Sequence, residues 1–159
     1  MINSNYSLQI IRQTRKNCLN ILDVFTIEEI NQIPKGFNNN LAWNFAHIIV
    51  TQQLLCYGLS GLTPLVSNEM ISQYRKGTKP GEFVSVEELD SFKELANSCI
   101  DQTIQDLDSG VFKEYKEYPT SYGITLHNIQ EAITFNASHE ALHFGTMISL
   151  KNALNLVKQ

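Results

Sequence analysis

The strongest chemical signal in the sequence is a pair of histidines one helical turn apart. Residues 139–143 read His-Glu-Ala-Leu-His. In an α-helix, residues four positions apart lie on one face, so His139 and His143 point to the same side and could chelate one divalent metal ion. Partly buried histidines that are hydrogen-bonded to neighbouring polar groups would show the same spacing. The pair alone therefore leaves both interpretations open.

A third histidine, His47, stands on the apolar face of a separate predicted helix. Trp43 lies one turn before it and Val50 about one turn after it. A lone inward histidine is most often a core residue, but a zinc-like ion needs a third protein ligand, which the pair lacks. We therefore predict that His47, His139 and His143 hold one divalent ion. One coordination position stays open to solvent, as in catalytic metal sites.

The chemistry of the ligands sets two further expectations. Three imidazoles accept zinc, nickel, copper or ferrous iron, so the residues do not identify the metal. Because the neutral imidazole is the ligand, protons should compete with the metal as the pH falls through the range near 6 to 6.5.

The same motif raises a metalloprotease hypothesis, in which Glu140 would activate a metal-bound water. At the positions where a metzincin has its glycine and third histidine, this sequence has Thr146 and Ser149, and residues 144–159 contain no Asp or Glu for a zincin-type ligand. The third ligand must therefore come from upstream. Glu140 remains a candidate catalytic base or orienting group, and a solvated helix carboxylate is the alternative.

Two other polar residues lie near the motif. Asn136 lies about one turn before His139, so it is a candidate to orient an imidazole or a bound water. His127 lies more than three turns before His139, which is too far to share the ion, and it is predicted to face the surface or a loop.

Four long helices must position these side chains. Apolar residues recur every three or four positions, and pairs such as Thr26 with Glu29 and Ser85 with Glu88 resemble capping boxes. Thr125 is predicted to cap the last helix. The four predicted helices cover residues 8–25, 40–58, 85–110 and 125–154.

A long connection should separate the second helix from the third. Residues 59–84 contain glycines and prolines, with one short helix predicted around 67–74. Each long helix is predicted to have one apolar stripe, so none is stable alone, and no strand alternation of useful length is present. We predict an all-α, four-helix-bundle domain spanning residues 1–159.

Composition narrows the classes of partner. The formal charge of −4 and the short basic clusters, at 12–16 and 75–79, give no general attraction for nucleic acid, and both clusters are interpreted as solvated surface. Cys18, Cys56 and Cys99 are odd in number and far apart, so no disulfide is expected. No apolar run is long enough for a membrane span. We expect a cytoplasmic protein that binds no membrane and acts on a small molecule.

Two motifs together resemble the DinB/YfiT-like superfamily. They are residues 43–48, Trp-Asn-Phe-Ala-His-Ile, and residues 139–145, His-Glu-Ala-Leu-His-Phe-Gly. The resemblance covers nearly the whole chain. It implies an up-down-down-up four-helix bundle with His47, His139 and His143 as ligands of nickel or zinc, and it implies that homodimers are common.

The resemblance also implies a reaction class. Members with known activity, such as bacterial low-molecular-weight thiol S-transferases and a mycothiol-dependent isomerase, use the metal to handle a thiol. By analogy the chain is expected to be a metal-dependent thiol S-transferase that acts on a small electrophile with a thiol cosubstrate. The alternatives are a metal-dependent hydrolase and a non-catalytic module that binds a metal or a small ligand.

Overall fold

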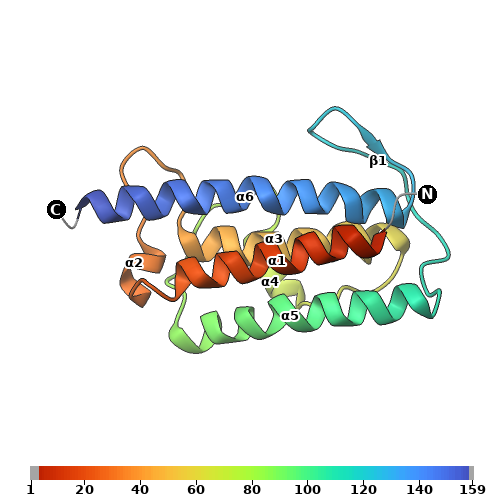
Figure 1. Cartoon of the computed structure of the whole chain (residues 1–159), viewed down its shortest axis with the longest axis horizontal. Helices are drawn as coiled ribbons and strands as arrows, with labels where there is room; N and C mark the ends of the chain where they lie inside the picture. Colours follow the sequence, from red (N-terminus) through yellow and green to blue (C-terminus); the bar gives the residue numbers. More distant parts are fainter. Residues whose placement is uncertain (1–3, 158–159) are drawn as a thin grey trace.

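Nearly all of the regular structure is helical. The computed structural model describes residues 4–157 and the side chains of residues 6–155. The long helices are α1 (Ser4–Leu22), α3 (Leu41–Cys56), α5 (Val86–Asp108) and α6 (Ile129–Val157) (Figure 1). The short elements are α2 (Ile27–Asn31), the 3-10 turn η1 (Gly58–Ser60), α4 (Asn68–Tyr74), β1 (Tyr118–Pro119) and β2 (Thr125–Leu126). The prediction of an all-α fold is confirmed.

The four long helices lie side by side. Helix α6 packs against α1 and α3, and α5 packs against the same two helices from the other side. In Figure 1, α1 and α6 run toward one end of the molecule, and α3 and α5 run toward the other. Because α3 and α5 run in the same direction, the chain between them has to return along the length of these helices. The predicted short helix in this connection is present as α4, which packs against α3.

Side-chain caps define several helix starts, as the sequence predicts. Thr26 caps α2 in a capping box, because its side chain accepts from the Glu29 backbone N–H and the Glu29 side chain accepts from the Thr26 N–H. Ser85 accepts from the Glu88 backbone N–H at the start of α5. These local hydrogen bonds need no tertiary partner, which is why the sequence alone reveals them.

The prediction that Thr125 caps the last helix is wrong. Thr125 lies in β2 and pairs with Pro119 of β1, so its backbone is extended. Helix α6 begins at Ile129, and the Asn128 side chain accepts from the Glu131 backbone N–H there. Strands β1 and β2 form a two-stranded antiparallel hairpin before this helix, and each is too short to show strand alternation in the sequence.

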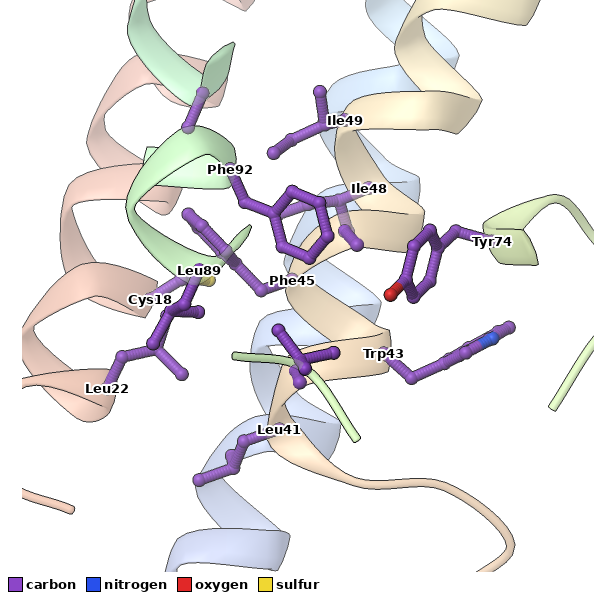
Figure 2. Packing of buried hydrophobic residues seen from close by; sticks show 14 of the residues in the cluster. Cys18, Leu22, Leu41, Trp43, Phe45, Ile48, Ile49, Tyr74, Leu89 and Phe92 are labelled. Atoms are coloured by element: carbon purple, nitrogen blue, oxygen red, sulfur yellow. The ribbon is translucent and has the colours of Figure 1, made fainter. Parts of the chain in front are cut away.

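Helix α3 is buried on almost every side, which corrects the prediction of a single apolar stripe. Helices α5 and α6 flank it, and α2 and α4 cover further faces. Figure 2 shows Phe45 and Ile48 of α3 packed near Phe92 of α5, with Trp43 beside Tyr74 of α4. A helix that is apolar all round is typical of a domain core. Helix α3 is thus the central support for any site on its surface.

The three cysteines are buried in the core. Cys18, Cys56 and Cys99 are buried free thiols, and burial raises the pKa of both Cys18 and Cys56 to about 12. A thiol with so high a pKa is a poor nucleophile at neutral pH.

In residues 4–157, no helix is both long and apolar enough to cross a membrane.

Candidate metal centre

The three predicted ligands meet where α3 packs against α6. The ring centroids of His139 and His143 lie 4.6 Å apart, and those of His47 and His143 are also 4.6 Å apart. The His47 and His139 centroids are 5.2 Å apart. One ligand nitrogen from each histidine lies within 4.8 Å of the other two. Histidines far apart in the sequence therefore form one cluster, as predicted, and the three could hold a metal ion.

The ring of His47 is fixed from several sides. Its Nδ1 lies 2.7 Å from the Tyr74 carbonyl oxygen, which can only accept a hydrogen bond, so Nδ1 carries the proton. The unprotonated Nε2 lies 3.3 Å from the Thr51 hydroxyl. The indole of Trp43 stacks on the imidazole with ring centroids 4.5 Å apart. The Nε2 lone pair of His47, which accepts from the Thr51 hydroxyl here, is the one that a metal ion would take in place of that bond.

The ring of His143 is fixed by an amide whose orientation is itself determined. Asn44 uses its Nδ2 to donate to the Asn39 side-chain oxygen and to the Asn40 carbonyl oxygen. Its Oδ1 therefore faces His143 Nδ1, at 2.9 Å, and accepts from it. His143 consequently has its proton on Nδ1 and its lone pair on Nε2. An amide or carbonyl that holds the second nitrogen is the usual companion of a metal-ligating histidine.

His139 has an unsatisfied buried atom. Its Nδ1 is buried and has no hydrogen-bond partner among the described residues. A buried polar atom without a partner costs free energy, so such an atom needs an explanation. A cation shared with His47 and His143 would provide one, because the cluster offers only neutral nitrogen donors of the kind that zinc and nickel accept. The residues present therefore fit a divalent metal ion.

Electrostatics keeps the three imidazoles neutral. Burial, and then the charge of neighbouring histidines, lowers the pKa of His139 to about 3 and that of His143 to about 4. Burial also lowers the pKa of His47, against the raising effect of its bond to Tyr74. The neutral form is the one that binds metal. Competition with protons should thus begin well below the range near 6 to 6.5 expected from the sequence.

Glu140 is engaged in a buried ion pair. Its carboxylate accepts from Arg15 Nη2 at 2.7 Å and from Arg15 Nε at 3.0 Å, and the two side chains are 0% and 1% exposed. Asn136 Nδ2 donates to the same carboxylate at 2.8 Å. Arg15 was interpreted as solvated surface, which is wrong, and the solvated-carboxylate alternative for Glu140 is wrong as well. Asn136 contacts Glu140 rather than an imidazole in the hydrogen bonds of the described residues.

Three contributors to the site carry little or no sequence signal. The Tyr74 carbonyl is a backbone group, so no residue type reveals it. Asn44 stands three residues before His47, where only its inward position in a buried helix could have suggested a role. Thr51 lies one turn after His47, and its residue type alone does not indicate a contact with the ring. His127, by contrast, is exposed and bonds Glu131, as its predicted surface position requires.

A cavity of about 410 Å³ opens beside the histidines. His47 and His139 line one part of it. Thr51 and Leu54, the two residues of α3 that are not fully buried, face it as well. The remaining lining comes from the end of α3, η1, the turn after α4, the hairpin and α6. Its side chains include Leu55, Leu59, Lys76, Tyr118, Thr120 and Phe135.

Comparisons with known proteins agree with this fold. A family model described as the DinB superfamily matches residues 10–147. A crystal structure of a conserved protein from Enterococcus faecalis is similar, with a TM-score of 0.68 and 14% sequence identity. The similarity covers 97% of this chain and 98% of that one. At this identity the likeness shows the fold alone. A search of curated protein sequences finds no match to the chain.

Proposed function

The chain belongs to the DinB superfamily, and from this premise and the histidine cluster we propose that it is a metal-dependent enzyme of the thiol S-transferase type. In this proposal His47, His139 and His143 hold one divalent ion, zinc or nickel, and the substrate is a small electrophile. The scaffold is the superfamily's up-down-down-up four-helix bundle. The directions of the long helices in Figure 1 and their pairwise packing support that arrangement.

One observation favours a thiol over water as the attacking group. Within residues 6–155, whose side chains the structure describes, no Asp or Glu lines the cavity beside the histidines, and both oxygens of Glu140 already accept hydrogen bonds from Arg15. Hydrolysis at a metal centre commonly uses a carboxylate to take a proton from water. A divalent ion, when bound, supplies Lewis acidity that lowers the pKa of a thiol enough to dispense with such a base.

The chain's own residues have defined tasks in this proposal. Tyr74 and Asn44 hold His47 and His143 as Nδ1–H tautomers, so both rings present Nε2 to the ion. The ion pair of Glu140 with Arg15 anchors α6 to α1 between the two histidines of the motif. Glu140 is thus proposed as an orienting residue rather than a base. The apolar part of the cavity wall excludes water from the electrophile.

Spectroscopy on cobalt-loaded protein tests the proposal. Adding bacillithiol, mycothiol or 2-mercaptoethanol should produce a sulfur-to-metal charge-transfer band. The band should disappear in His139→Ala and persist in His127→Ala, which replaces an exposed histidine outside the cluster. Conjugation of monochlorobimane should then require both metal and thiol.

The two alternative functions, a metal-dependent hydrolase and a non-catalytic binding module, predict different results in these assays. If no thiol perturbs the cobalt spectrum while esters or amides are cleaved, the protein is a hydrolase and the transferase proposal is wrong. A metal centre that binds neither thiol nor exchangeable water would instead identify a non-catalytic binding module.

A further inference from the structure

Lys76 gives the described lining of the cavity beside the histidines a positive charge. Among the described residues that line the cavity, Lys76 is the only one besides His47 and His139 whose side chain can be charged at neutral pH, because Tyr118 is a phenol and no Asp or Glu contributes. In the part of the chain that the structure describes, Lys76 takes part in no ion pair. Its ammonium group is therefore available to a ligand.

The position of Lys76 is fixed by hydrogen bonds on both sides. Before it, the Tyr74 carbonyl accepts from His47 at 2.7 Å. After it, the Thr78 hydroxyl oxygen accepts from Trp43 Nε1 at 3.1 Å. Two residues of α3 thus hold the segment on either side of Lys76, and the contact with His47 joins this segment to the metal centre itself. Lys76 is exposed but held at the edge of the cavity.

The rest of the wall is largely apolar. Leu54, Leu55 and Leu59 come from α3 and η1, and Phe135 comes from α6. An apolar group placed among them would lose contact with water, which stabilises binding by roughly 25 cal/mol per Å² of apolar surface. The volume of about 410 Å³ lies within the usual range of small-molecule sites.

From this combination we propose that the cavity binds a small molecule with an apolar body and one anionic group that pairs with Lys76. The inference rests on the proposed function in one respect: it takes the end of the cavity that His47 and His139 line as the place where the reaction occurs. An anion also suits the metal centre, since a divalent ion adds charge of the same sign as Lys76.

Three compounds with the same apolar body test the proposal: 4-phenylbutyrate, the neutral 4-phenylbutanamide and the cationic 4-phenylbutylamine. Dissociation constants should be measured by calorimetry at pH 7.5 and low salt, on protein as purified and again after chelation. The acid should bind about 2- to 5-fold tighter than the amide, since a partly exposed ion pair contributes on this order. Butyrate, which lacks the phenyl group, should bind much more weakly.

Two substitutions of Lys76 test whether this residue causes the preference for the acid over the amide. Lys76→Met should weaken binding of the acid by the same factor and leave the amide unchanged, and Lys76→Glu should favour the amine. Lys79→Met is the matched control, because Lys79 is an exposed lysine near the same segment that lines a different cavity. Because Lys76 is exposed, each variant should fold, and melting temperature checks this.

Equal affinities for the three compounds, no saturable binding of any of them, or an acid preference that survives Lys76→Met would overturn the inference. A preference that survives Lys76→Met but disappears on chelation would place the carboxylate on the metal instead. A different set of results would contradict the proposed function while leaving this inference intact. Protein that binds no metal or transfers no thiol, but keeps a Lys76-dependent preference after chelation, would contradict the enzyme proposal alone.

Discussion

Replacing Glu140 with glutamine should destabilise the protein rather than merely slow a reaction. Glutamine keeps the shape of the side chain but removes its charge, so Arg15 is left as an unpaired cation that is 1% exposed. The carboxylate accepts two bonds from Arg15 and one from Asn136, at 2.7 to 3.0 Å. Removing one partner of a buried ion pair costs about 3–5 kcal/mol of folding free energy.

The size of the expected change in melting temperature follows from the chain length. With an unfolding entropy of about 2.1 cal/mol/K per residue, a chain of 159 residues has an unfolding entropy of about 0.33 kcal/mol/K. A loss of about 3–5 kcal/mol then lowers the melting temperature by about 9–15 °C. Circular dichroism during heating measures this shift, and urea titration gives the free energy directly.

Two controls test whether the loss of stability comes from leaving a buried charge unpaired. Arg12 and Asp101 form an ion pair at 2.6 Å with side chains 43% and 55% exposed, so Asp101→Asn should cost less than about 1 kcal/mol. The double variant Arg15→Met with Glu140→Gln should be more stable than Glu140→Gln alone, because no buried charge remains unpaired. If Glu140→Gln melts within about 2 °C of the wild type and only loses turnover, the carboxylate is a catalytic base and our reasoning about it is refuted.

Two further predictions concern the histidines and the groups that hold them. Metal-free protein should lose about 2–4 kcal/mol of stability between pH 6.5 and 5, because the pKa of His139 and His143 falls to about 3 and about 4 on folding, so the unfolded chain binds more protons in this range. Urea titrations across this range measure the loss, which should shrink in His139→Ala; a flat profile would contradict the burial argument. Asn44→Ala should lower metal affinity about 10- to 100-fold, since His143 loses the acceptor that fixes its tautomer. Competition with a chelator measures this, and unchanged affinity would show that Asn44 does not orient the ring.

The histidine cluster was predictable because much of its geometry is local. A spacing of four residues places His139 and His143 on one face of any helix, and the apolar neighbours of His47 indicate that it points inward. The meeting of the two helices then follows from the burial of both faces. The caps at Thr26 and Ser85 were predictable for the same reason, since both involve residues three apart.

The ion pair and the cavity depend on packing that the sequence does not display. Arg15 and Glu140 are 125 positions apart, and their pairing depends on how α1 and α6 are aligned along their lengths. Arg15 occupied the single polar step in an apolar stripe, which is the one signal that could have identified it as buried. Lys76 sits in a basic cluster that gives no hint of the adjacent cavity. The cavity itself requires the hairpin, the turn after α4 and two long helices to be in place together.

The most direct test of the metal centre is the metal content of protein purified without chelators or added metal. Elemental analysis should find close to one divalent ion per chain in the wild type and in His127→Ala. In His47→Ala most of that ion should be absent, although the pair on α6 is intact and circular dichroism shows a folded chain. Full occupancy in His47→Ala, or a wild-type protein that takes up no divalent metal even when it is offered, would contradict the three-histidine site.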